Sequence, residues 1–436
     1  MVMEKFTIFW FRRDLRIEDN RGLYEALRGK NKVIPIFIYD TAIIDKLTKD
    51  DHRLTFIQNA LGGINNAMKG NRCTVGIYRG TPKAIFKQII REFPIDKVIT
   101  NHDYERYAIE RDEEIRTLLK AEGIDFATYK DQVIYEKKEV VKDDGKPYVV
   151  YTPYSRKWRA KFGEEGIKNY PSEDHLDNLY TDKPLPQISL HEMGFEISKL
   201  VPKKFRFDKN VIDQYEETRN FPAIDSTSRL GVELRFGTQS VRKLVAKSAE
   251  RENPTFLKEL IWREFFMQIL WHYPNTEDQC FKKQYDRIEY RNDEKEFEKW
   301  CQGKTGYPLV DAGMRQLNET GFMHNRVRML VSSFLCKHLL IDWRWGEAYF
   351  AEKLFDYEKA SNLGNWQWVA GCGVDAAPYF RIFNPHEQVK KFDKNLNYIN
   401  QWVKDINQLT YPEPIVEHKF ARERCLKEYK VALTPA

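Results

Sequence analysis

Four side chains of mixed chemistry repeat at helical spacing near the middle of the chain. They are Glu259, Trp262, Arg263 and Phe266, and a spacing of three or four residues places all of them on one helical face. A carboxylate, an indole, a guanidinium and a phenyl ring do not form an ordinary core stripe. The set predicts a pocket for a flat molecule with polar edges. An amphipathic helix with a salt-bridged rim is the alternative.

A second cluster lies in the segment His324-Asn-Arg-Val-Arg-Met. Asn325, Arg328 and Met329 share one helical face, whereas Arg326 points towards a second face. An Asn amide can read the edge of a base, Arg can hold phosphate, and Met offers a soft apolar contact. The pattern is compatible with nucleic-acid contacts, and a basic helix facing solvent is the alternative.

Two further segments carry candidate binding groups. The first, Thr227-Ser-Arg-Leu-Gly231, offers two hydroxyls, a guanidinium and a glycine. Such groups can cradle a pyrophosphate, although a capped helix start would explain them equally well. The second, Asn362-Leu-Gly-Asn-Trp-Gln-Trp368, precedes more glycines. Composition alone describes this second segment as a helix junction.

Several other chemistries have no support in the sequence. The histidines are scattered, and the six cysteines show no CxxC spacing, so no metal site is predicted. The cysteines are expected to be buried thiols. Neither a Walker sequence nor a GxGxxG after the first strand is present. Any catalysis is therefore expected to use a bound organic cofactor.

Composition sets the remaining limits. The chain has 436 residues, enough for two or three domains, and a net charge of +6 that points weakly to a polyanionic partner. Aromatic residues make up 14% of the chain, and ten of them are Trp. No apolar run is long enough for a membrane span, and the first ten residues do not resemble a signal peptide. A cytoplasmic protein without a membrane segment is predicted.

The residues from 1 to 130 alternate between apolar strands and helical stretches, which is typical of a doubly wound parallel sheet. Strands are predicted at Phe6–Trp10, Val33–Phe37, Thr74–Tyr78 and Val98–Thr100, and helices at Asn20–Arg28, Leu54–Met68, Pro82–Phe93 and Ala108–Glu122.

Residues 131–205 are rich in Lys, Asp, Pro and Tyr, as expected of a long surface linker. Helical periodicity then continues through 206–436. The predicted architecture is an α/β domain, a linker and an all-helical domain. The clearest helices in the last region are Ser240–Ala249, Pro254–Trp271, Tyr307–Glu319, Asn325–Leu340 and Trp345–Leu354.

Taken together, these strings resemble those of the photolyase and cryptochrome family, and specifically of the class I cyclobutane pyrimidine dimer photolyases. They stand in the family's order and cover nearly the whole chain. The segments that carry the resemblance are Phe11–Arg16 with Asp19-Asn20, Thr227–Leu230, Trp262–Phe265, Thr305–Pro308 with Asp311, His324–Arg326, Asp342–Arg344, Asn365–Trp368 and Arg381–Pro385.

The resemblance implies an FAD site in the helical domain and an N-terminal domain for an antenna chromophore. Asn362 would face flavin N5, where its amide oxygen can accept a hydrogen bond from N5–H and favour the reduced cofactor. Gly231 and Glu358 replace the Ser and Asp that are common in relatives. The other implied FAD contacts are Tyr215, Thr227, Ser228, Arg229, Leu230, Arg263, Phe266, Arg328 and Asp356.

The implied substrate is DNA that contains a cyclobutane pyrimidine dimer, which must be flipped out of the duplex. Glu259 and Asn325 would hydrogen-bond the edges of the dimer. The apolar walls would be Trp262, Met329 and Trp368, and the contacts to the DNA backbone would be Arg219, Arg326 and Gln388.

By the same resemblance, three aromatic residues would carry electrons to the flavin. Trp366 and Trp343 match the first two positions. Tyr290 falls on the third, where relatives usually carry Trp. Oxidised Tyr must lose its proton, so slow or pH-dependent photoreduction is predicted. Tyr290 would end the chain, or another aromatic such as Trp345 would replace it.

The antenna chromophore is less closely defined. Ala108 stands where folate-binding relatives have Glu, and the segment from Asp103 to Tyr107 resembles flavin or deazaflavin binders more closely. Arg12 and Asp103 are the predicted contacts. FMN, FAD or a deazaflavin is favoured over methenyltetrahydrofolate, and an empty antenna site is the alternative.

The protein is predicted to act as a monomer. Two other functions are alternatives to dimer repair. A (6-4) photolyase needs a pair of histidines at the lesion, and the segment Met323-His-Asn disfavours it. A cryptochrome photoreceptor would signal through a partner, often with a long C-terminal extension. Here the chain ends at Ala436 and keeps Glu259, Trp262, Asn325 and Met329. A cryptochrome relative that prefers single-stranded DNA is a further alternative.

Overall fold

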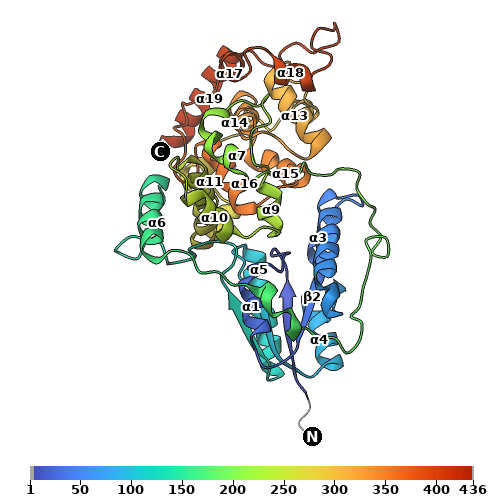
Figure 1. Ribbon diagram of the computed structural model, residues 1–436. Coiled ribbons are helices and arrows are strands. Elements are labelled where there is room, and N and C mark those ends of the chain that lie inside the picture. The colour runs from blue at the N-terminus through green and yellow to red at the C-terminus, as the bar shows by residue number, and fades with distance from the viewer. Residues whose placement is uncertain (1–3, 435–436) are drawn as a thin grey trace. The chain divides into compact units, whose positions relative to one another are not determined.

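The computed structural model describes residues 4–434. The chain packs as two compact units (Figure 1). The sheet unit comprises the residues up to 139, residues 159–201 and residues 231–250. The helical unit comprises residues 140–158, 202–230 and those from 251 onwards. Each unit is therefore assembled from three stretches of sequence.

The sheet unit is built on five parallel strands in the order β3-β2-β1-β4-β5. β1 and β2 are buried along their whole length, so both consist of near-continuous apolar residues. At the centre, Ile8 of β1 is paired with Ile34 and Val98. The strands are β1 (Phe6–Phe11), β2 (Val33–Asp40), β3 (Gly76–Gly80), β4 (Ile95–Asn101) and β5 (Asp125–Tyr129).

Helices cover both faces of this sheet (Figure 1). Right-handed crossovers place α1 and α3 on one face and α4 and α5 on the other. Asn20 caps α1, and Thr81 caps α4 ahead of Pro82. The helices of the unit are α1 (Arg21–Leu27), α2 (Thr41–Ile44), α3 (His52–Met68), α4 (Pro82–Glu92), α5 (Arg106–Ala121), α9 (Gly231–Phe236) and α10 (Val241–Ala249), with short turns at Lys69–Asn71 and Ser172–Asn178.

The predicted fold class is confirmed: a doubly wound parallel sheet comes first, and helices dominate the rest. The sequence missed β5, an edge strand whose residues are half-buried or exposed. Residues 131–205 also differ from a plain linker, because they contain the helix α6 (Tyr151–Glu165). The domain limits 1–130, 131–205 and 206–436 stay a prediction, since compact packing does not show which segments fold independently.

The helical unit centres on α11, α14 and α16. α14 does not run to residue 340 as predicted, because a π-helical turn, Phe334–His338, follows Ser333. The helices of this unit are α7 (Lys209–Asp213), α8 (Tyr215–Thr218), α11 (Thr255–His272), α12 (Glu294–Gln302), α13 (Pro308–Thr320), α14 (Asn325–Ser333), α15 (Trp343–Lys353), α16 (Lys359–Ala370), α17 (Pro385–Phe392), α18 (Asn397–Trp402) and α19 (His418–Leu433), with short turns at Pro274–Glu277 and Lys283–Arg287.

Two glycines set how closely these helices approach. A Cβ on Gly364 of α16 would lie 2.2 Å from the Phe266 ring of α11, and one on Gly346 of α15 would lie 2.1 Å from the Trp366 ring. Both rings therefore rest directly on the backbone of the neighbouring helix. Within residues 4–434, no helix is long and apolar enough to cross a membrane.

Candidate functional site

A cavity of about 530 Å³ lies inside the helical unit. This volume falls in the range usual for small-molecule and cofactor sites. The cavity combines aromatic walls with several charged side chains. Of the predicted site residues, those that line it are Tyr215, Arg219, Thr227, Glu259, Trp262, Arg263, Phe266, Asn325, Arg326, Arg328, Met329, Asp356, Glu358, Asn362, Trp366 and Trp368.

The face of α11 predicted from the sequence does line this cavity. The Trp262 ring is fixed by stacking on Tyr151, with centroids 3.7 Å apart and planes 7° from parallel. Glu259 forms an ion pair with Arg219, which also lines the cavity. The carboxylate is therefore presented on the wall, but it is held by a cation that a ligand would have to displace or share.

α14 contributes a second wall. Arg328 donates to both oxygens of Asp356, at 3.1 and 2.8 Å, and its Nε bonds the carbonyl of Met323 at 2.7 Å. Arg326 also lines the cavity, although the helical spacing predicted a different face for it. Its guanidinium bonds Asn220 and lies 4.5 Å above the Phe392 ring. α14 thus supplies cations on two adjoining sides.

α16 provides the floor. Glu358 caps this helix through the amides of Ala360 and Ser361 at 3.2 and 2.8 Å, so its side chain has a structural partner. One turn on, Asn362 donates from Nδ2 to a carboxylate oxygen of Glu347 at 2.9 Å. Because the amide nitrogen is held in this way, the amide oxygen of Asn362 is the end left to accept a hydrogen bond from a ligand.

The segment that precedes α9 has only one member in the cavity, Thr227. Ser228 accepts the amide of Leu230, and Arg229 takes a left-handed backbone (φ +61°) with its guanidinium 4.0 Å above Phe322. Arg229 is also paired with Asp225 at 2.9 Å. Gly231 is the first residue of α9. A phosphate-binding role for the whole segment, Thr227–Gly231, stays a prediction.

The predicted electron carriers are close to one another in the helical unit. Trp366 lines the cavity and rests on Gly346, one turn along α15 from Trp343, which is fully buried. Tyr290 lies beside the start of α15, because the amide of Arg291 bonds the carbonyl of Leu340 at 2.8 Å. Burial raises the pKa of the Tyr290 hydroxyl well above its ordinary value. Among residues 4–434, that hydroxyl has no hydrogen-bond partner.

The predicted antenna residues occupy a charge cluster of the sheet unit. Arg12 pairs with Asp112 at 2.5 Å, and Arg13 pairs with Asp103 at 3.3 Å. Burial opposes ionisation of Asp103, but the charges of Arg13 and Arg12 outweigh it and hold its pKa at about 2. Arg12 and Asp103 are thus neighbours. Gln388, a predicted DNA contact, lies on α17 and outside the cavity lining.

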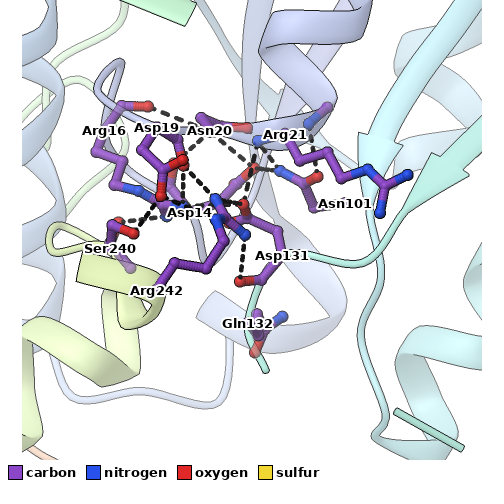
Figure 2. Close-up of polar contacts among 12 residues, drawn as sticks. Asp14, Arg16, Asp19, Asn20, Arg21, Asn101, Asp131, Gln132, Ser240 and Arg242 are labelled. Carbon is purple, nitrogen blue, oxygen red and sulfur yellow. Dashed lines mark hydrogen bonds and ion pairs between the residues drawn. The ribbon is translucent and has the colours of Figure 1, made fainter. Parts of the chain in front are cut away.

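The rest of the motif after β1 forms a buried ion cluster (Figure 2). Asp131 accepts hydrogen bonds from Arg16 at 2.9 and 2.8 Å and from Arg242 of α10 at 2.8 Å. Arg242 also bonds Asp19 at 2.8 Å. The residues that carried part of the family resemblance therefore fasten the loop after β1 to α10 within the sheet unit.

His324 and Glu347 are residues of the site to which the sequence assigned no role. His324 caps α14, lines the cavity and has a buried Nε2 without a partner among the described residues. Burial, followed by the charges of Arg229, Arg328 and Arg326, lowers its pKa to about 4, so the ring is neutral. Glu347 stands fifteen residues before Asn362, and no local pattern links the two.

Two known protein families match the chain. Residues 7–172 match the DNA photolyase family, and residues 256–410 match the FAD-binding domain of DNA photolyase. The chain is 35% identical to the deoxyribodipyrimidine photo-lyase of Halobacterium salinarum, over 98% of this chain and 99% of that protein. The chain therefore belongs to the photolyase and cryptochrome family, as an FAD-binding enzyme of the lyase class.

Solved structures agree with this assignment. A class III photolyase from Agrobacterium tumefaciens has a TM-score of 0.86 and 31% identity, covering 99% of this chain and 98% of the other. An archaeal photolyase from Sulfolobus tokodaii with two FAD molecules has 0.83 and 32%, covering 98% and 100%. A Synechocystis cryptochrome has 0.82 and 25%, again covering 98% and 100%.

The cavity residues fit FAD. Trp262, Phe266 and Trp366 give flat apolar contacts, and the oxygen of Asn362 can accept a hydrogen bond from a ring N–H. Arg263 and Arg328 supply the positive charge that a pyrophosphate needs. The buried Nε2 of His324 offers one more polar contact. The residues from 4 to 434 contain no cluster of His, Cys, Asp or Glu that could hold a metal ion.

Proposed function

We propose that the protein uses light to repair cyclobutane pyrimidine dimers in DNA. One observation carries the proposal: Asn362, which is predicted to face the flavin, and Glu259, Trp262 and Asn325, which are predicted to face the lesion, line the same cavity. A dimer flipped into this cavity would contact the cofactor directly. Membership of class I stays a prediction, and a class III photolyase is among the similar solved structures.

Reduced FAD, when bound and excited, supplies the electron that opens the cyclobutane ring. The protein contributes position and environment. Asn362 fixes the flavin edge through its amide oxygen, because Glu347 holds the amide nitrogen. Glu259 and Asn325 hydrogen-bond the dimer, and the stacked Trp262 forms one apolar wall that excludes water.

The remaining lesion contacts follow the same arrangement. Met329 and Trp368 complete the apolar lining of the cavity. Arg219, Arg326 and Gln388 contact the DNA backbone, so binding weakens as salt rises. Arg219 leaves or shares its ion pair with Glu259 when the dimer enters. The protein acts as a monomer in the cytoplasm.

Electrons for flavin reduction pass along Trp366 and Trp343. Tyr290 is a poor last donor, because its buried hydroxyl has no described acceptor for the proton that an oxidised Tyr must lose. Trp300 offers another route, since its ring centroid lies 6.3 Å from that of Trp366. Phe297 then links Trp300 to Trp345, with centroid separations of 5.8 and 5.2 Å.

A flavin or deazaflavin bound near Arg12 and Asp103 serves as the antenna in the sheet unit. The solved structure of the Sulfolobus photolyase contains two FAD molecules, which supports a flavin at such a site. The pairing of Arg12 with Asp112 means that binding must rearrange this charge cluster. Absorption and mass analysis of the chromophores released from the purified protein identify the antenna.

The direct test of repair is to illuminate the reduced protein with an oligonucleotide that contains a thymine dimer, and to follow the return of thymine absorbance. Trp262→Ala should weaken dimer binding, whereas Trp271→Ala, on the same helix but outside the cavity lining, should not. No return of absorbance with intact FAD would refute the repair function.

A cryptochrome photoreceptor is the second candidate, because the Synechocystis cryptochrome shares the fold over almost the whole chain. A protein that reduces its flavin in light and binds dimer DNA without repairing it would favour this function. A (6-4) photolyase is disfavoured, since His324 is the single histidine among the described residues that line the cavity.

A further inference from the structure

The indole of Trp262 is covered on one face by the ring of Tyr151. The two rings lie face to face, with centroids 3.7 Å apart and planes 7° from parallel. Trp262 lines the cavity of the helical unit, whereas Tyr151 is not among the described residues of the lining. Tyr151 therefore supports the proposed lesion wall without forming part of the cavity surface.

Tyr151 is itself held by two hydrogen bonds. Its hydroxyl donates to the carbonyl of Lys258 at 2.8 Å, and its amide donates to a carboxylate oxygen of Asp375 at 3.3 Å. Lys258 lies four residues before Trp262 on α11. The hydroxyl therefore fixes Tyr151 to the same helix that carries its stacking partner, and the Tyr151 ring is not free to follow Trp262 into another orientation.

The residues that follow Tyr151 on α6 bind the same helix. Tyr154 donates from its hydroxyl to Glu264 of α11 at 3.4 Å, and Trp158 donates from Nε1 to the same carboxylate oxygen at 2.5 Å. All three of these side chains are buried. Tyr151 thus belongs to a segment that is fastened along α11 at successive turns, and moving it would break several buried contacts.

Phe265 closes the side of the stacked pair. Its ring meets Tyr151 edge-on at 6.0 Å and 76°, and it meets Trp262 edge-on at 5.6 Å and 81°. An unsupported Trp side chain exchanges among staggered rotamers, and a ligand that binds it must select one of them. Here the stack holds the indole in one orientation before any ligand arrives, so this ordering cost arises in folding and not in binding.

We propose that Tyr151 is a positioning residue for dimer recognition, which acts by holding the Trp262 indole in the orientation that receives the flipped dimer. The inference rests on the proposed function, in which Trp262 forms a wall of the lesion site. It assigns part of the selectivity for damaged DNA to a residue that does not line the cavity.

Such a role has a specific signature in binding. The predicted contacts to the DNA backbone, Arg219, Arg326 and Gln388, do not include Trp262, so losing the Tyr151 ring should leave the affinity for undamaged DNA unchanged. The affinity for dimer DNA should fall, because that binding alone uses the indole. Once the dimer is bound, repair should proceed at the normal rate, so KM should rise while kcat stays near wild type.

The test measures binding of the FAD-containing protein, in the dark, to fluorescently labelled oligonucleotides with and without one thymine dimer. Tyr151→Leu should weaken binding of the dimer oligonucleotide by about tenfold, as expected for the loss of one aromatic pair and one ordered side chain. Fluorescence anisotropy gives both dissociation constants. Repair under constant light at several DNA concentrations gives KM and kcat separately.

Two further variants separate the ring from the hydroxyl and from the segment. Tyr151→Phe keeps the stacked ring and loses only the bond to Lys258, so it should retain most of the affinity for dimer DNA. Tyr148→Leu is the matched control, because the Tyr148 ring packs on Tyr154, with centroids 6.4 Å apart. It removes a tyrosine ring from the same segment and should bind both oligonucleotides as wild type does.

A double variant shows whether Tyr151 acts through Trp262. If it does, Tyr151→Leu should cause no further loss of dimer binding in a protein that already carries Trp262→Ala. A general structural defect would instead add to the effect of Trp262→Ala. Should Tyr151→Leu fail to retain FAD, Tyr151→Met provides the same comparison, since its flexible side chain fills the space without a flat ring.

Three results overturn the proposal. They are unchanged dimer affinity in Tyr151→Leu, equal losses for damaged and undamaged DNA, and additive losses in the double variant. If Trp262→Ala weakens dimer binding and Tyr151→Leu does not, the positioning role fails and the lesion wall stands. If Trp262→Ala itself leaves dimer binding unchanged, the lesion wall of the proposed function fails, and the role of Tyr151 fails with it.

Discussion

Replacing Asp131 tests the buried ion cluster of the sheet unit most directly. Asp131 and its partners Arg16 and Arg242 are each at least nine-tenths buried in the sheet unit (Figure 2). Burial alone would raise the pKa of this carboxyl, but Arg16 and Arg242 outweigh it and lower the pKa from 3.8 to about 2. Asp131→Asn keeps the size of the side chain and removes the charge.

The magnitude follows from linkage. A folded pKa of about 2 against 3.8 in the unfolded chain corresponds to about 2.4 kcal/mol of stability at neutral pH. Because the folded pKa is the lower one, this contribution is complete above pH 3.8 and is lost as the pH falls, with about half gone by pH 3. Leaving two buried arginines short of a partner brings the expected total loss to about 3–5 kcal/mol.

Urea unfolding followed by far-ultraviolet circular dichroism measures the loss at pH 7. Hydrogen exchange of the peptides from β1 and α10 shows whether it arises in the sheet unit. Asp96→Asn is the matched control, because Asp96 pairs with the exposed Lys5, and such a surface pair contributes about 0–1 kcal/mol. A loss at Asp131 no larger than that of the control would refute the reasoning.

Three further predictions concern the helical unit. Asn362→Asp should place a negative charge beside the flavin and lower its midpoint potential, which a spectroscopic redox titration measures; an unchanged potential would place Asn362 away from the flavin ring. Trp366→Phe should slow flavin photoreduction strongly, because both routes pass through Trp366, whereas Tyr290→Phe should leave it nearly normal if the route through Trp300 operates; transient absorption distinguishes the two outcomes. The pKa of His324 lies at about 4 when folded, below its ordinary 6.5, so stability is lost as the pH falls through that interval. The flavin-free protein should lose about 2 kcal/mol between pH 7 and pH 5, and His324→Asn, which keeps the helix cap, should lose less in urea unfolding.

The elements that the sequence predicted are those with a strong repeating pattern. β1 and β2 are continuous apolar runs, and α11 shows its cavity face at helical spacing. β5 was missed because an edge strand with half-exposed residues has little hydrophobic pattern to detect. The break in α14 was missed because the π-helical turn, Phe334–His338, directly continues the helix and all five of its residues are buried.

The candidate site shows the same limit. Glu259, Arg263 and Asn362 could be predicted, because the residues around them match family motifs. Glu347 could not, since its contact with Asn362 joins two different helices. The motif after β1 indicated the right family but not the structural role of Arg16 and Asp19. Their partners, Asp131 and Arg242, lie more than 100 residues away in the sequence.

α16 couples the parts of the site physically. Asn362, Trp366 and Val369 line the cavity at successive turns of this helix. Gly364 lets the helix rest on the ring of Phe266, and Trp366 rests on Gly346 of α15. A shift of α16 would therefore move the predicted flavin contact, the predicted electron path and the predicted lesion wall together.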